Sequence, residues 1–174
     1  MNPGFDVRLT SMHRAMATVI IPAIDPENQL AIEQAALMLG HIGILAAQWD
    51  KVDDYSRLCL GDILAVARAL RAGGGPATTE AAVQLQGLAQ SPASRAEQAY
   101  QAIAGALEAL VRAADVDGDE AFRRTLHQQV LLHANRQAAR DRAWFVACGF
   151  DVNTKDLPSL DELVGRTGVV PHGS

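Results

Sequence analysis

Residues 31–70 read AIEQAALMLGHIGILAAQWDKVDDYSRLCLGDILAVARAL, and apolar side chains recur here at alternating steps of four and three residues. Twelve positions follow the pattern, and Ser56 is their one polar member: Ala31, Ala35, Met38, Ile42, Leu45, Trp49, Val52, Ser56, Cys59, Ile63, Val66 and Leu70. A 3.5-residue repeat of this length is typical of one very long helix, or of two helices stacked nearly in line. Asp25-Pro26-Glu27 favours a helix start, and Gly73-Gly74-Gly75-Pro76 favours a stop. We therefore predict one very long helix over about 26–72.

The rest of the chain also has the pattern of helices. Hydrophobic residues make up 49% of the 174 positions and aromatic residues only 5%, and no stretch alternates apolar and polar residues as a half-buried strand does. Breaks and apolar stripes place further helices over about 11–21, 79–90, 92–114, 119–148 and 160–164. We predict an all-α bundle of about four main helices, in a single helical domain over 1–174 with an irregular C-terminal extension at about 150–174.

The expected long helix also predicts self-association. A helix of about 46 residues is roughly 70 Å long, whereas a compact domain of this size is roughly 40 Å across. The apolar stripe would then extend beyond its own domain, and a second copy of the chain is the simplest cover for it. We therefore predict a homodimer.

Composition bears on partners and location. The net charge of −5 argues against nonspecific binding of nucleic acid, which needs a basic face. We see no signal-peptide pattern and no apolar run long enough to cross a bilayer. Cys59 and Cys148 lie on apolar helical stripes, which favours buried free thiols over a disulfide. We expect a cytoplasmic protein without membrane or nucleic-acid partners.

A row of polar residues runs beside the apolar repeat. Gln34, His41, Gln48, Tyr55 and Asp62 recur every seven residues and so share one face of the expected helix. In a two-stranded packing this row would be a half-solvated flank that sets the register. In a bundle it would point inward, and its members would need hydrogen-bond partners. His41, Tyr55 and Asp62 would then line a pocket.

The last long helix carries a second polar group. His133, Arg136 and Arg140 follow three-four spacing on one stripe. Two guanidinium groups one helical turn apart can bind a carboxylate or a phosphate with paired hydrogen bonds. The same arginines can equally form structural ion pairs with one of three carboxylates: Asp53, Asp54 and Asp141.

Known catalytic and metal-binding motifs are missing from the chain. It has no Gly-x-Ser-x-Gly turn, phosphate-binding loop, dinucleotide fingerprint or Cys-x-x-Cys pair. The acidic run Asp115–Asp119 lacks the glycine position and the final glutamate of a calcium loop. We expect neither a metal nor a cofactor.

Two functions remain. The first is a dimeric helical-bundle binding or accessory protein of bacterial metabolism, which encloses a small ligand or presents a surface to a partner; the alanine-rich helices resemble those of bacterial helical proteins of unknown role. The alternative is a small cofactor-independent enzyme acting on an anionic or aromatic metabolite. Its candidate catalytic residues are His41, His133 and Tyr55, and its candidate substrate-binding residues are Arg136, Arg140, Asp62 and Trp49.

Overall fold

The computed structural model describes residues 4–148 and 153–165, and these form seven α-helices and no strand. The all-α class is therefore confirmed. The described chain divides into two compact units. Unit 1 contains the residues up to Val52 and from Asp141 onward, and unit 2 contains Asp53–Arg140. The single domain expected from the sequence stays a prediction, and each unit is described here by itself.

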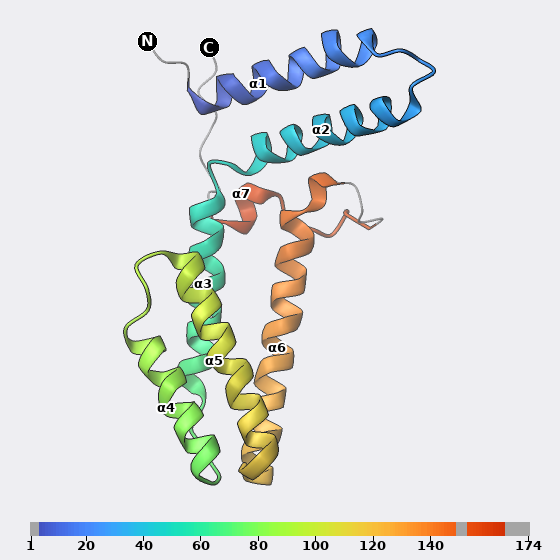
Figure 1. Ribbon diagram of the computed structural model, residues 1–174. Coiled ribbons are helices and arrows are strands. Elements are labelled where there is room, and N and C mark those ends of the chain that lie inside the picture. The colour runs from blue at the N-terminus through green and yellow to red at the C-terminus, as the bar shows by residue number, and fades with distance from the viewer. Residues whose placement is uncertain (1–3, 149–152, 166–174) are drawn as a thin grey trace. The chain divides into compact units, whose positions relative to one another are not determined.

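Unit 1 is built around a helical hairpin. Helix α1 spans Phe5–Ala15 and continues through a π-helical turn, Met16–Ile20, and a 3₁₀ turn, Ile21–Ala23. Helix α2 spans Gln29–Gln48 and returns alongside α1 (Figure 1). The expected start at Asp25 is displaced, because the Asn28 side chain caps α2 by accepting a hydrogen bond from the Ala31 N–H at 3.1 Å.

The C-terminal part of unit 1 is short. A 3₁₀ turn, η3 (Val146–Cys148), packs near α2, and α7 spans Leu160–Leu163. Ser159 and Glu162 form a reciprocal capping box at the start of α7, which confirms the short helix expected after Ser159. Much of the irregular extension expected at about 150–174 lies outside the described residues.

The prediction of one very long helix over about 26–72 is wrong. Helix α2 ends at Gln48, and α3 spans Val52–Ala69. Between them the Lys51 N–H bonds to the carbonyl of Gln48 at 2.8 Å, three residues back instead of four. Asp53 and Asp54 then stand in the first turn of α3, where carboxylates are favoured by the positive end of the helix dipole. The apolar repeat continues in phase through this turn, so it did not reveal the break.

Unit 2 contains α3, α4 (Pro76–Gln90), α5 (Ala96–Asp117) and most of α6 (Glu120–Trp144). These helices share one core whose largest fully buried apolar side chains are Ile63, Leu85, Ile103, Leu110 and Leu126. The apolar repeat supplies Ile63 and Val66 of α3, and Leu70 just after it, to this core. This part of the stripe is therefore covered within unit 2 and does not need the second copy that the sequence analysis expected.

The connection from α3 to α4 is held by the C-terminal end of α5, at Asp117, and by Asp119 just after it. Gly74 has a φ of +144°, and a Cβ there would lie 2.6 Å from the carbonyl oxygen of Asp117. The Asp117 carboxylate accepts hydrogen bonds from the Ala77 and Thr78 N–H groups and from the Thr78 hydroxyl. These bonds, the hydroxyl first, lower the pKa of Asp117. Asp117 thus caps the N-terminus of α4 from another helix.

Candidate functional site

Three basic side chains meet at one carboxylate, that of Asp62, in unit 2. Asp62 projects from α3, and His133, Arg136 and Arg140 project from successive turns of α6. His133 Nδ1 lies 2.7 Å from Asp62 Oδ2, Arg136 Nε lies 3.0 Å from Oδ1, and Arg140 Nη1 lies 3.1 Å from Oδ2. We call these four residues the Asp62 cluster. They join the polar row of α3 to the polar stripe of α6, two patterns that the sequence offered separately.

The Asp62 carboxyl group is ionised in this setting. Its side chain is 14% exposed, and burial alone would raise its pKa. Hydrogen bonds from Arg140, His133 and Arg136 outweigh burial and lower the pKa from 3.8 to about 2. An ionised carboxylate only accepts hydrogen bonds, so the Nδ1–H of His133 is the donor. Asp62 therefore selects the tautomer of His133 and leaves Nε2 as its basic nitrogen.

A second set of contacts extends the cluster along α3. Gln137 on α6 accepts a hydrogen bond from Arg140 at 3.3 Å, and its amide nitrogen lies 3.3 Å from the Tyr55 hydroxyl and 3.4 Å from Cys59 Sγ. The ring of Tyr100 on α5 lies 6.4 Å from that of His133. Among the described residues, no buried side-chain nitrogen or oxygen lacks a hydrogen-bond partner. The buried polar atoms of the cluster thus all have partners, in a network that links α3 with α6.

The predicted site residues fall into two groups. Five of them belong to unit 2: Tyr55, Asp62, His133, Arg136 and Arg140. Asp62 contacts the last three directly, and Tyr55 is linked to Arg140 through Gln137. The Asp62 carboxylate receives hydrogen bonds from the two arginines, and its expected role in substrate binding stays a prediction. Of the two alternatives for the arginines, the structure contains the ion pairs, with Asp62 in place of Asp53, Asp54 or Asp141.

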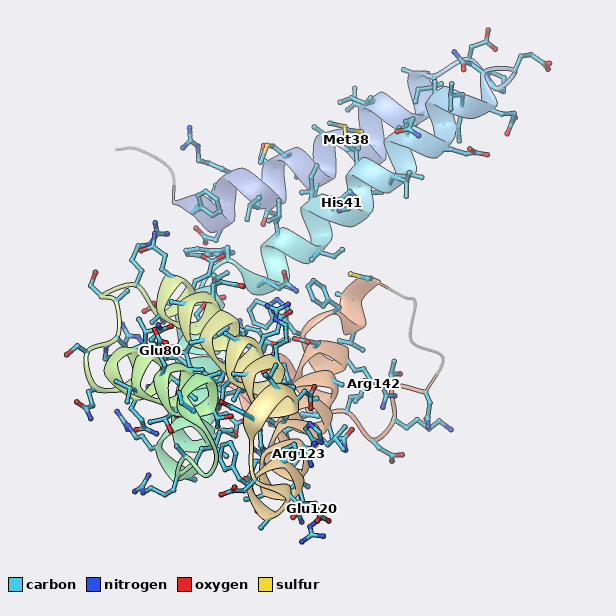
Figure 2. The ribbon with its side chains drawn as sticks, turned by 60° about the horizontal axis from the view of Figure 1, so that its bottom comes forward. Met38, His41, Glu80, Glu120, Arg123 and Arg142 are labelled. Atoms are coloured by element: carbon cyan, nitrogen blue, oxygen red, sulfur yellow. The ribbon has the colours of Figure 1, made fainter. Side chains whose placement is uncertain are left out.

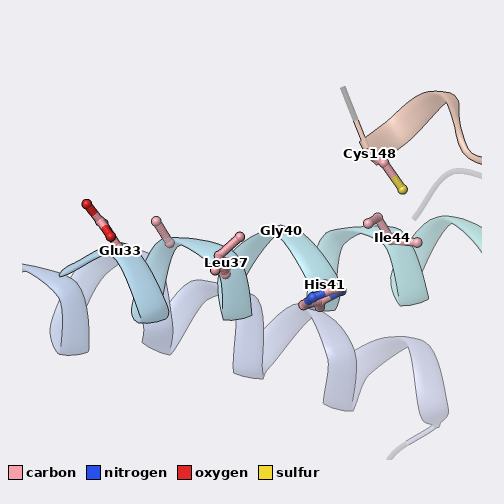
Figure 3. Close-up of a pocket in the computed structure, with 7 residues that line it drawn as sticks. Glu33, Leu37, Gly40, His41, Ile44 and Cys148 are labelled. Carbon is pink, nitrogen blue, oxygen red and sulfur yellow. The ribbon is translucent and has the colours of Figure 1, made fainter. Parts of the chain in front are cut away.

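His41 and Trp49 belong to unit 1. His41 is exposed on α2 and lines a cavity of about 580 Å³ together with Leu37, Gly40, Ile44 and Cys148 (Figure 3). The indole ring of Trp49, just beyond the end of α2, lies 5.3 Å from the ring of Phe5 on α1. None of the residues that line this cavity belongs to the Asp62 cluster.

Two residues escaped the sequence analysis as parts of these sites. Gln137 joins Arg140 to Tyr55 and Cys59, and its spacing of four residues from His133 was the available signal, since it places both on one helix face. Cys148 lines the cavity on α2, and no local pattern connects it with that helix.

The hairpin of unit 1 carries an apolar surface. Ten large apolar side chains between residues 5 and 49 are exposed: Phe5, Val7, Met12, Val19, Ile20, Leu30, Leu37, Met38, Leu45 and Trp49. Figure 2 shows Met38 and His41 on this hairpin, where side chains stand out from the ribbon. Ala35 and Gln48 are the buried residues of α2, and Gln48 donates a hydrogen bond to the carbonyl of Trp144 at 2.7 Å. We call the ten exposed apolar side chains the hairpin surface.

Helix α2 is also long and apolar enough to cross a membrane by length and composition alone. A single helix of this kind is weak evidence for a membrane span, since core helices of soluble proteins pass the same test. Comparison of the chain with protein-family models, with curated proteins and with solved structures gives no match. Its function is therefore inferred from the Asp62 cluster and the hairpin surface.

Proposed function

We propose that the protein is a homodimeric helical binding or accessory protein, and that the hairpin surface is where the two copies meet. One observation carries the proposal: α2 is apolar on nearly all sides, yet only 6% of its most apolar stretch is buried. A helix that is apolar all round belongs in the interior of an assembly. Within unit 1, α1 and η3 contact α2 but leave most of its apolar side chains exposed, and we assign the remaining cover to a second copy of the chain.

A second hairpin supplies that cover with a known geometry. Helix α2 has 20 residues, and α1 with its two following turns extends over a similar length, from Phe5 to Ala23. Two such helical arms joined by a short connection are half of an antiparallel four-helix bundle, and two copies complete it. Each half-exposed apolar side chain that becomes buried contributes on the order of 1 kcal/mol. Covering half of the ten side chains in both copies contributes on the order of 10 kcal/mol, which is comparable to the cost of association.

Charge favours a protein partner over a lipid surface. Residues 5–48 contain four acidic residues, Asp6, Asp25, Glu27 and Glu33, and only two arginines. Helix α2 has no lysine or arginine, whereas helices that bind anionic membranes are basic on their polar face. In an antiparallel pair of hairpins, the acidic turn of one copy would approach α1 of the other, which carries Arg8 and Arg14.

Charge reversal on the hairpin surface tests the proposal. We expect the wild-type protein to have twice the 18.5 kDa mass of the chain, and the double variant Leu37→Glu/Leu45→Glu to be monomeric, because two carboxylates would be buried unpaired in each half of the interface. Light scattering coupled to size-exclusion chromatography measures both masses.

The matched control places the same two charges on unit 2. Val83 and Leu131 are comparably exposed on α4 and α6, so Val83→Glu/Leu131→Glu should leave the dimer intact. A monomeric wild type, or equal dissociation of both double variants, would contradict the proposal. If the wild type is monomeric and binds phosphatidylcholine–phosphatidylglycerol vesicles, the hairpin surface binds a membrane and not a second copy of the chain.

The other expectations remain predictions. Ligand binding is supported by the cavity on α2, which apolar side chains dominate. The enzyme alternative is supported by the Asp62–His133 hydrogen bond, because a histidine held by a carboxylate is a suitable general base. The cytoplasmic location follows from the sequence expectation alone.

A further inference from the structure

The Asp62 cluster carries more positive than negative charge. Arg136 and Arg140 stay protonated at all physiological pH values. Asp62 supplies one negative charge, so the four residues hold a net charge of +1 when His133 is neutral. Arg140 and His133 are mostly buried, and an excess charge in such a place is costly unless a counter-ion reduces it.

The guanidinium groups also have donors to spare. Arg136 contacts Asp62 through Nε alone, at 3.0 and 3.3 Å, so its two terminal nitrogens take no part in that ion pair. Arg140 uses Nη1 for both Asp62 and Gln137, which leaves Nη2 outside these bonds. The Arg136 side chain is 44% exposed, so a solute can reach its terminal nitrogens.

Asp62 fixes where these two groups lie. Both guanidinium groups bond to one carboxylate and leave α6 one turn apart, so they are neighbours before any ligand arrives. Long flexible side chains lose less entropy on binding when they are already ordered. Paired N–H donors on planar groups match the geometry of carboxylate and phosphate oxygens.

We propose that Arg136 and Arg140 bind an oxyanion, the phosphate or carboxylate group of a small ligand, through the guanidinium nitrogens that Asp62 does not use. Arg136 forms the solvent-facing half of the site, and the mostly buried Arg140 supplies positive charge beneath it. The site lies wholly within unit 2, so it is independent of the proposed role of the hairpin surface in unit 1.

Titration calorimetry with inorganic phosphate at constant ionic strength and neutral pH tests the site. We expect saturable binding to the full-length protein, and we expect Arg136→Gln to weaken it at least about tenfold, because charge-assisted hydrogen bonds are lost. Arg136→Lys keeps the charge but loses the planar pair of donors, so it should also weaken binding. Acetate is a second probe: binding of phosphate alone assigns a phosphate ligand, and binding of both assigns a general oxyanion site.

Arg124→Gln on the same helix is the matched control. Arg124 is exposed and paired with Glu120, so its loss should leave phosphate binding unchanged. Circular dichroism verifies that each variant is folded. If Arg136→Gln does not fold, phosphate binding to Arg136→Lys is compared with that of the wild type instead. Equal weakening by Arg124→Gln and Arg136→Gln, or absence of saturable binding of both anions to the wild type, would overturn the proposal.

Discussion

Replacing Asp62 with alanine is expected to lower the free energy of unfolding by about 2–4 kcal/mol. This loss is larger than the one we expect from breaking an exposed ion pair on the same helix. The substitution leaves three donors, His133, Arg136 and Arg140, facing one another without their shared acceptor. Removing one partner of a fully buried ion pair costs roughly 3–5 kcal/mol, and partial exposure of the cluster reduces that figure. Urea unfolding followed by circular dichroism measures the loss.

Asp53→Ala is the control on the same helix. Asp53 pairs with Arg57 at 2.7 Å, but both side chains are exposed, so this change should cost less than about 1 kcal/mol. Equal losses in the two variants would show that the Asp62 cluster contributes no more than a surface ion pair.

The pH dependence of the free energy of unfolding should differ between the wild type and Asp62→Ala. A carboxyl group whose pKa falls from 3.8 unfolded to about 2 folded stabilises the fold above pH 3.8 and loses that contribution as the pH falls toward 2. The shift corresponds to about 2 kcal/mol. The stability difference between the wild type and Asp62→Ala should therefore narrow between pH 4 and pH 2.

The second large effect is expected in the core of unit 2. Leu126 on α6 is completely buried, so Leu126→Ala should destabilise the protein by roughly 2–5 kcal/mol through lost burial and a residual cavity. Leu131 on the same helix is 63% exposed, and Leu131→Ala should change stability by no more than about 0.5 kcal/mol. Both variants carry the same substitution on the same helix, so the difference between their urea unfolding midpoints measures the effect of burial. Similar midpoints would contradict the assigned core.

The sequence predicted the helical class because helical periodicity is local. The same argument failed at residues 49–51, since an apolar repeat can pass in phase through a turn that separates two helices. Asp53 and Asp54, in the first turn of α3, were the signal for the new helix start. Likewise, Asp117 caps α4 from 39 residues away in the chain, a contact that no local pattern contains.

The candidate site was predicted in its parts but not in its assembly. Three-four spacing correctly placed His133, Arg136 and Arg140 on one face of α6, and the seven-residue repeat singled out Asp62. Their meeting depends on how α3 packs against α6, which involves residues more than 70 positions apart. His41 shares the repeat with Asp62, but the break after Gln48 assigns it to unit 1.

The central claim is that a second copy of the chain covers α2, and amide hydrogen exchange of residues 29–48 measures this cover directly. We expect these amides to exchange slowly and to become better protected as the protein concentration rises, because the dimer buries the side of α2 that stays exposed in the monomer. Rapid exchange of α2 at every concentration, with unit 2 fully protected in the same sample, would contradict it.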